Sequence, residues 1–151
     1  MTEPDGAMGL IDIQINGGWG HDFTADPASI WEVGRRLPGT GVTAFLPTIV
    51  SAPYEFIDAA IEVIKAGPPQ GYDGADAVGL HIEGPWISRE WKGAHNPDHL
   101  RLPDQGVARR WAESGAVKMV TLAPELDHAF ETAGILSDSG VVVSAGHSGA
   151  D

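Results

Sequence analysis

Side chains that can bind a metal ion follow two of the apolar runs in this sequence. His81 and Glu83 are two residues apart, so on a β-strand both would face the same interior. An ionised Glu buried there needs a metal ion, a basic side chain or a proton, because an unpaired charge in a packed interior costs several kcal/mol. No basic residue is adjacent to it in the sequence, and His147 supplies a nitrogen ligand that suits zinc or iron. Glu83 and His147 are therefore predicted to form part of a metal site.

Each of these residues also has a simpler interpretation. Glu83 could be a hydrogen-bonded carboxylate at a strand end, and His147 could be a core histidine with its hydrogen bonds satisfied. Glu125 could accept a hydrogen bond near the metal, or it could stabilise the start of the next helix, since carboxylates suit a helix N-terminus. Trp86 and Trp91 could line a pocket or cover the end of the fold. The residue pattern alone leaves these alternatives open.

The composition excludes several classes of partner. Asp and Glu total 21 against 9 for Lys and Arg, a formal net charge of -12 that disfavours nucleic acids and anionic membranes. The sequence has no cysteine, so any metal must be held by His and carboxylate side chains. Residues 1–8 lack the basic start and apolar run of a signal peptide, and no stretch approaches the roughly 18 apolar residues of a membrane span. We expect a cytoplasmic location, with residues 1–8 disordered or tag-like.

Five short apolar runs, rich in β-branched residues, predict strands. They cover residues 10–15, 42–50, 77–82, 117–122 and 141–145. Several runs are apolar almost throughout, which is typical of parallel strands that have helices on one face and a filled interior on the other.

Four segments between the strands have helical spacing. The first begins at Asp26 and the second near Ser51, and the third and fourth cover about residues 104–114 and 126–136. The side chains expected to face inward are Ile30, Val33 and Leu37 in the first, Phe56, Ile57, Ala60, Ile61 and Ile64 in the second, Val107 and Trp111 in the third, and Phe130 and Ala133 in the fourth. The connection over residues 84–103 is far longer than the usual four to six residues, and long loops after strand ends are often functional.

Alternating strands and helices predict an α/β fold with a parallel sheet, because parallel neighbours need a crossover and a helix is the usual one. In such folds the ligand site lies at the carboxyl ends of the strands. Polar residues occur at four of these ends, and we expect them to converge: Gln14 and Asn16, Glu83, Glu125, and His147.

Six segments, in order, resemble the successive signatures of N-acetylglucosamine-6-phosphate deacetylases. They are Gly-Leu-Ile-Asp-Ile-Gln-Ile-Asn-Gly at 9–17, Gly-Val-Thr-Ala-Phe-Leu-Pro-Thr at 41–48, His-Ile-Glu-Gly-Pro-Trp at 81–86, Lys-Gly-Ala-His-Asn at 92–96, Ala-Pro-Glu at 123–125 and Ser-Ala-Gly-His-Ser at 144–148. The resemblance covers nearly all of residues 9–151, and its most specific part is the His-x-Glu-Gly-Pro segment with the Lys-Gly-Ala-His that follows.

This resemblance implies a fold and a set of binding residues. The fold would be a partial TIM-like (β/α) barrel of the amidohydrolase superfamily, with about five of the eight βα units. Glu83 and His147 match the first two ligands of one divalent metal ion, expected to be Zn²⁺. Ala94 matches a position whose backbone contacts the sugar substrate, and His95 and Asn96 lie in the same loop and are expected to help shape the pocket.

A sequence difference at the end of the first strand bears on the number of metal ions. Many amidohydrolases have His-x-His there, whereas this chain has Gln14-x-Asn16, which is similar to deacetylases with a single metal. Two neutral amides favour one tightly held ion over two.

The activity that the resemblance implies is metal-dependent hydrolysis of the N-acetyl group of N-acetylglucosamine 6-phosphate, giving glucosamine 6-phosphate and acetate. The complete enzyme would be a homodimer. Its third metal ligand, its general acid/base Asp and most of its phosphate contacts would lie beyond Asp151, so we expect negligible turnover by this chain alone. The alternatives are a non-catalytic truncated fragment and an amidohydrolase that acts on a related N-acyl amino sugar phosphate.

Overall fold

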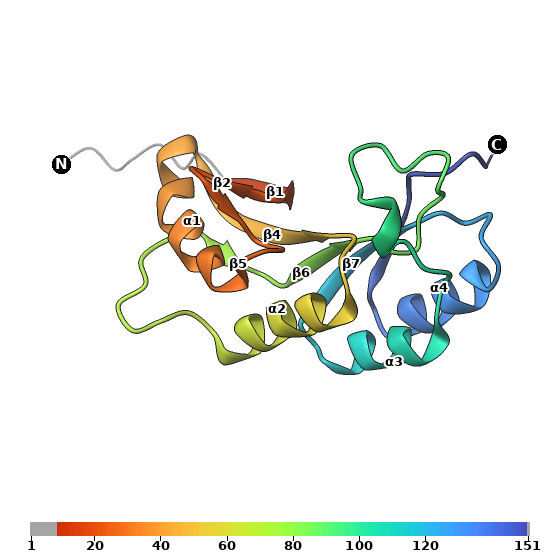
Figure 1. Cartoon of the computed structure of the whole chain (residues 1–151). Coiled ribbons are helices and arrows are strands. Elements are labelled where there is room, and N and C mark those ends of the chain that lie inside the picture. The colour runs from red at the N-terminus through yellow and green to blue at the C-terminus, as the bar shows by residue number, and fades with distance from the viewer. Residues whose placement is uncertain (1–8, 151) are drawn as a thin grey trace.

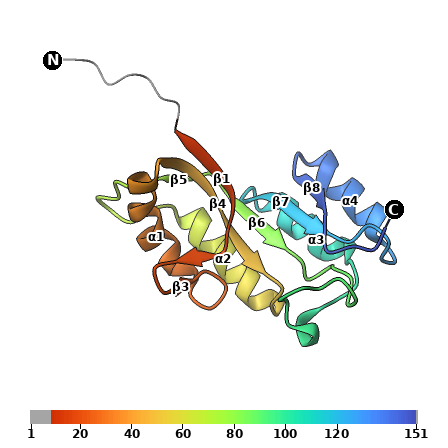
Figure 2. The same ribbon diagram turned by 90° about the horizontal axis from the view of Figure 1, so that it is seen from above.

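The computed structural model describes residues 9–150, so the expectation for residues 1–8 lies outside the described part. Five strands form the main order of a curled six-stranded sheet in which every neighbouring pair is parallel (Figures 1 and 2). Their order in the sheet follows their order in the chain: β1 (Leu10–Ile15), β4 (Val42–Val50), β6 (Leu80–Glu83), β7 (Val117–Leu122) and β8 (Val142–Ala145). The predicted α/β class with a parallel sheet is therefore confirmed.

Four helices occupy the crossovers between these strands. They are α1 (Ile30–Arg36), α2 (Tyr54–Ala66), α3 (Gln105–Glu113) and α4 (Ala129–Asp138), and 3-10 turns flank α1 at Pro27–Ser29 and Leu37–Thr40. Figure 1 shows α2, α3 and α4 on one side of the sheet, whereas the long connection between β6 and α3 lies on the other side. The helices thus cover the outer face, and the long connection covers the opposite face near the strand ends.

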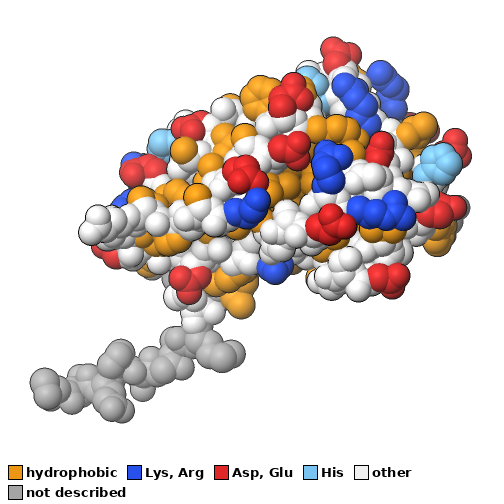
Figure 3. Space-filling model, turned by 90° about the horizontal axis from the view of Figure 1, so that it is seen from below, with side chains coloured by type: hydrophobic (Ala, Val, Ile, Leu, Met, Phe, Trp, Pro, Cys, Tyr) orange, Lys and Arg blue, Asp and Glu red, His pale blue; other side chains and the backbone are white. Residues whose placement is uncertain are grey.

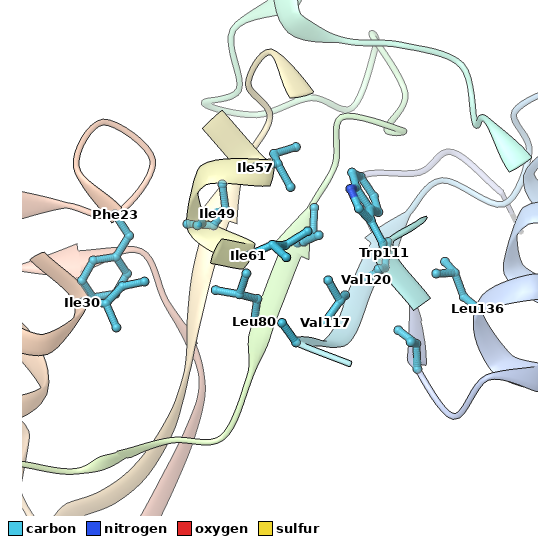
Figure 4. Close-up of a cluster of buried hydrophobic side chains, with 14 of the residues drawn as sticks. Phe23, Ile30, Ile49, Ile57, Ile61, Leu80, Trp111, Val117, Val120 and Leu136 are labelled. Atoms are coloured by element: carbon cyan, nitrogen blue, oxygen red, sulfur yellow. The ribbon is translucent and has the colours of Figure 1, made fainter. Parts of the chain in front are cut away.

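The apolar core lies between the sheet and the helices (Figure 4). Ile57 and Ile61 of α2 pack toward Leu80 of β6, and Trp111 of α3 joins the same cluster. Trp86, from the long connection, stacks on Trp111 with ring centroids 4.6 Å apart and is itself 0% exposed. Its role is therefore to fasten the start of the long connection to the core rather than to line a pocket.

Two aromatic residues that we expected to face inward are exposed instead. Phe56 is 43% exposed and Phe130 is 81% exposed. In each helix the residue beside the aromatic one is buried instead, Ile57 in α2 and Ala129 in α4. Neighbouring residues of a helix point about 100° apart around its axis, so the aromatic side chain faces away from the core. The prediction therefore placed both aromatic side chains on the buried face of their helices, and both lie outside it.

The predicted strand over residues 77–82 is divided in two. A short strand β5 (Asp76–Ala77) pairs with β4, and β6 begins only at Leu80. Between them Gly79 has a φ of +144°, and a Cβ atom there would lie 2.8 Å from the carbonyl oxygen of Ala116. The chain therefore bends at a residue that only glycine can fill, so one apolar run forms two strands.

A small antiparallel hairpin follows β1 and was not predicted. It consists of β2 (Gly17–Gly18) and β3 (His21–Asp22), and Trp19 and Gly20 form its turn with positive φ angles of 50° and 90°. Phe23, directly after the hairpin, is buried beside Ile30 (Figure 4). The hairpin thus closes the connection between β1 and α1 onto the core.

Within residues 9–150, β1 and β8 each pair with one strand only and form the two edges of the sheet. Apolar side chains are exposed along both edges: Leu10, Ile11 and Ile13 on β1 are 62%, 65% and 53% exposed, and Val142 on β8 is 59% exposed. Such edges are typical of an incomplete barrel. Elsewhere, on the face drawn in Figure 3, acidic and basic side chains alternate with small apolar patches. None of the described helices has the length and apolar character needed to cross a lipid bilayer.

Candidate metal centre

Polar residues from three of the four strand ends that were expected to converge, those of β1, β6 and β8, line one pocket, whereas Glu125 after β7 does not line it. The pocket has a volume of about 310 Å³, and its walls come from β1, β4, β6, the long connection and the segment after β8. The lining residues are Gln14, Asn16, Val50, Glu83, Ala94, His95 and His147. Polar side chains from distant parts of the chain therefore face one small space.

Glu83 is at the centre of this pocket and is 8% exposed. Its Oε1 atom lies 2.9 Å from Nε2 of His147 and 3.7 Å from Nε2 of His95. Its Oε2 atom accepts a hydrogen bond from the Gln14 amide at 2.8 Å and a longer one from the Asn16 amide at 3.5 Å. Each carboxylate oxygen thus has its own set of partners.

These contacts keep Glu83 ionised. His95 makes the largest contribution and His147 a further one, and together they outweigh the effect of burial and lower the pKa of Glu83 from 4.5 to about 2. By distance His147 is the closer of the two rings. Within the described residues both ion-pairing partners of Glu83 are histidines, so the stabilising cation that a buried carboxylate needs is a protonated ring or a metal ion.

The hydrogen bonds of His147 determine which of its nitrogens is free. Its Nδ1 atom lies 3.1 Å from the backbone carbonyl oxygen of Trp91, which can only accept, so Nδ1 carries a hydrogen. In the neutral ring Nε2 then has a lone pair, and that lone pair points at Oε1 of Glu83. Two lone pairs 2.9 Å apart repel each other unless a proton or a cation is shared between them. This is the arrangement in which a histidine can bind a metal ion, with a carbonyl group fixing its orientation.

His95 is held in the opposite way. Its Nδ1 atom accepts a hydrogen bond from the backbone N–H of Ser51 at 3.3 Å and also contacts the Ser51 hydroxyl at 2.8 Å. Because a backbone N–H can only donate, the hydrogen of the neutral His95 ring is on Nε2. The nitrogen of His95 that faces Glu83 is therefore a hydrogen-bond donor rather than a metal ligand.

The donor set fits one divalent ion of the zinc class. Ligand atoms of Glu83, His95 and His147 lie within 4.8 Å of one another. Two ligands about 2.0–2.1 Å from a tetrahedral ion are about 3.3 Å apart, which is close to the 2.9 Å between Glu83 and His147. Glu83 and His147, the two ligands expected from the sequence, belong to this group, and their assignment as ligands stays a prediction.

The three residues expected to contact substrate lie in different places. Ala94 and His95 line the pocket. Asn96 does not: its side chain accepts a hydrogen bond from the Asp98 amide at 3.0 Å and caps the 3-10 turn Pro97–His99. Trp91, for which two interpretations were open, is 55% exposed and contributes a backbone carbonyl to His147 rather than its ring.

Glu125 also lies close to this centre, although it does not contact Glu83 or His147. Its carboxylate accepts hydrogen bonds from the hydroxyl of Ser148 at 2.6 Å and from the backbone N–H of Gly149 at 2.8 Å. Burial raises the pKa of Glu125, but these hydrogen bonds outweigh it and leave the pKa below its ordinary value. Of the two interpretations open for Glu125, the structure favours the one in which it acts near the site, since its partners directly follow His147.

His81 faces the same interior as Glu83 but does not join the cluster. It is 0% exposed, and its ring lies 2.8 Å from the Thr121 hydroxyl and 3.1 Å from the carbonyl oxygen of Ile13. Burial lowers its pKa, so the ring is neutral. His81 therefore links β1, β6 and β7 beneath the pocket.

The chain is similar to known enzymes over most of its length, although no protein-family model matches it. It is 43% identical to the N-acetylglucosamine-6-phosphate deacetylase of Bos taurus and 44% identical to that of Homo sapiens, each over 155 residues. These matches cover 96% of this chain and 37% of each relative, so the chain spans well under half the length of the curated relatives that it matches.

Solved structures give the same result. The crystal structure of N-acetylglucosamine-6-phosphate deacetylase from Pasteurella multocida has a TM-score of 0.83 at 29% sequence identity, covering 94% of this chain and 38% of that one. A mutant deacetylase from Mycobacterium smegmatis, in complex with N-acetyl-D-glucosamine-6-phosphate, has a TM-score of 0.79 at 32% identity, covering 94% of this chain and 37% of that one. The predicted resemblance and the partial TIM-like barrel are confirmed.

Proposed function

We propose that this chain carries the metal-binding part of a site that hydrolyses the N-acetyl group of N-acetylglucosamine 6-phosphate, giving glucosamine 6-phosphate and acetate. The observation that supports this most strongly is the pairing of the Glu83 carboxylate with the free Nε2 atom of His147 at 2.9 Å. The relatives and the solved structures carry the name of this activity over the same stretch of sequence. A cytoplasmic location and a homodimeric complete enzyme remain predictions from the same resemblance.

The proposed division of roles follows from which atoms are free. Glu83 would bind the ion through Oε1, because Oε2 is held by the amides of Gln14 and Asn16. His147 would bind through Nε2, because Nδ1 is held by the carbonyl of Trp91. When bound, a divalent ion such as Zn²⁺ supplies Lewis-acid chemistry: it lowers the pKa of water and stabilises negative charge that develops on an amide oxygen.

His95 would act on the substrate rather than on the ion. Its Nε2–H lies beside Oε1 of Glu83 and faces the pocket, where it can donate a hydrogen bond to the oxygen of an N-acetyl group. The backbone N–H and hydroxyl of Ser51 fix the ring in that orientation. Ala94, a small residue in the pocket wall beside it, leaves room for a sugar ring.

We further propose that this chain alone turns over slowly or not at all. Within the described residues Glu83 is the one carboxylate that lines the pocket, and its proposed roles leave it no part as a general acid: Oε2 accepts from Gln14, and Oε1 would bind the ion. Proton transfer to the leaving amine by a general acid is typically worth a factor of about 10²–10⁴. Full activity is therefore proposed to require a general acid that the described residues of the pocket do not supply.

An acetate-release assay with added zinc tests this proposal. The chain is compared alone and joined to the remaining part of a relative such as the Bos taurus enzyme. We expect deacetylation in the joined protein, loss of it on Glu83→Gln or His147→Asn, and little in the short chain. A joined protein that keeps full activity after both substitutions would contradict the proposed roles.

Two rivals give different results in the same assay. A non-catalytic chain would bind no stoichiometric zinc and would yield no activity when joined to the remainder of a relative. An amidohydrolase with a related substrate would bind zinc and would prefer another N-acyl amino sugar phosphate in a panel of substrates. Zinc content separates the first rival from the proposal, and the panel separates the second.

A further inference from the structure

We propose that Glu125 is a positioning residue that holds His147 in its metal-binding orientation by fastening the segment after it. This inference rests on the proposed function, since it assigns a role toward the same ion. Glu125 lies after β7, and His147 lies after β8. The contact between the two strand ends is therefore made by side chains and loop backbone beyond the paired strands.

Two hydrogen bonds make this contact. The Ser148 hydroxyl donates to Oε2 of Glu125 at 2.6 Å, and the backbone N–H of Gly149 donates to Oε1 at 2.8 Å. Hydrogen bonds to an ionised acceptor are stronger than those between neutral groups. Both carboxylate oxygens thus bind the two residues that immediately follow His147.

The long connection holds the same segment from the other side. The backbone N–H of Ser88 donates to the carbonyl oxygen of His147 at 3.0 Å, and the carbonyl of Trp91 accepts from its ring. Gly149 is so close to Trp91 that a Cβ atom there would lie 2.4 Å from the indole nitrogen. The segment is therefore clamped between Glu125 and the long connection.

His147 needs such a clamp because of its backbone. Its φ angle is 51°, in the left-handed region that residues other than glycine rarely adopt. Regular pairing of β8 ends at Ala145, so the sheet does not impose this conformation. Contacts of the surrounding segments must therefore hold this conformation. The long connection contacts His147 itself, and Glu125 contacts the two residues that follow it.

The consequence is a preorganised ligand. The Nε2 atom of His147 lies 2.9 Å from Oε1 of Glu83 only while the segment keeps its path. Loss of the Glu125 contacts would let residues 147–149 adopt other backbone conformations, and binding an ion would then require ordering them again. Groups that orient a metal ligand in this way typically change metal affinity by about 10–100-fold.

The test measures zinc affinity of the whole chain by competition with a chelating dye, for the unchanged protein and for Glu125→Ala, Glu125→Gln, Ser148→Ala and the double variant Glu125→Ala/Ser148→Ala. We expect a loss of about 10-fold or more for Glu125→Ala and a smaller loss for Glu125→Gln, whose amide oxygen can still accept one hydrogen bond. The effect of Ser148→Ala should largely disappear once Glu125 is already Ala, because the two residues act through one contact.

Glu131→Gln is the matched control, since it removes the same charge from an exposed position of α4 nearby. It should leave zinc affinity unchanged. Hydrogen–deuterium exchange of the Gly149 amide gives a second readout that needs no metal, and exchange should rise in Glu125→Ala while the core remains protected. Unchanged exchange at Gly149, or zinc affinity in Glu125→Ala equal to that of a zinc-binding parent, would overturn the inference and leave the proposed function intact. A parent that binds no zinc would instead overturn the proposed function, and exchange at Gly149 would still decide the role of Glu125.

Discussion

Nε2 of His147 lies 2.9 Å from Oε1 of Glu83, although the two residues are 64 positions apart in the sequence. Glu83 is the last residue of β6 and His147 follows the end of β8, and β7 lies between these two strands in the sheet. A parallel sheet that follows the chain order brings all its carboxyl ends to the same edge, so this meeting is a direct consequence of the fold. The same edge receives the amides of Gln14 and Asn16, which leave one oxygen of Glu83 free for an ion.

The acid stability of the chain is expected to depend on Glu83. Its pKa in the folded chain is lowered from 4.5 to about 2, so the folded state favours the carboxylate. This contribution, on the order of 3 kcal/mol at most, is fully present above about pH 4.5 and is lost as the pH falls toward about 2. In urea unfolding with a chelator present, the free energy of unfolding of Glu83→Gln should fall less over this pH range than that of the unchanged chain. Equal pH dependence of the two proteins would contradict the prediction.

The two histidines near Glu83 are expected to be different tautomers when neutral. The hydrogen should be on Nδ1 of His147 and on Nε2 of His95, because a carbonyl and a backbone N–H respectively contact their Nδ1 atoms. Nitrogen-15 NMR of the rings distinguishes these forms directly. For zinc affinity we expect a loss of about 100-fold in His147→Asn and of less than about 10-fold in His95→Asn. Equal losses would show that His95 is also a ligand.

Gln14 is expected to hold Glu83 in its ligating position. Gln14→Ala removes the hydrogen bond to Oε2, so the pKa of Glu83 should rise and zinc affinity should fall by about 10-fold. Carbon-13 NMR of the Glu83 carboxyl group follows the pKa, and a dye competition follows the affinity. Gln70→Ala, at an exposed position in the loop after α2, is the control and should change neither. A Glu83 pKa that stays the same in Gln14→Ala would exclude this role.

His81 is expected to stabilise the fold rather than the ion. His81→Asn cannot reach both the Thr121 hydroxyl and the Ile13 carbonyl, and leaving buried polar groups unpaired should cost about 2–4 kcal/mol. Since burial lowers the pKa of His81, its neutral ring contributes stability above about pH 6.5, and this contribution falls as the pH drops below that value. The same substitution at His128, which is exposed and has a positive φ that Asn tolerates, should cost little in urea unfolding.

The arrangement of the strands was predictable because buried parallel strands leave a local signature. The apolar runs at β1, β4 and β7 have the bounds expected from the sequence, and the polar residues that follow the runs indicated where the strand ends meet. The break at Gly79 was not predictable in this way, since it depends on a close approach to the carbonyl of Ala116, which is far along the chain.

The parts of the site that the sequence did not predict depend on contacts between segments that are far apart in the sequence. His95 was expected near the substrate, but its contact with Glu83 and its tautomer result from Ser51, at the end of β4. Likewise the role of Glu125 became clear only from its hydrogen bonds to Ser148 and Gly149. No periodic pattern encodes such contacts, because they join loops whose paths are set by packing.

The central claim is that Glu83 and His147 hold a metal ion. A calorimetric titration of the chelator-treated chain with zinc tests it most directly. We predict one zinc site per chain for the unchanged protein, and loss of that site in both Glu83→Gln and His147→Asn, with the folded structure of each variant verified by circular dichroism. A chain that binds no zinc, or variants that bind it as tightly as their parent, would contradict the claim that these two residues hold a metal ion.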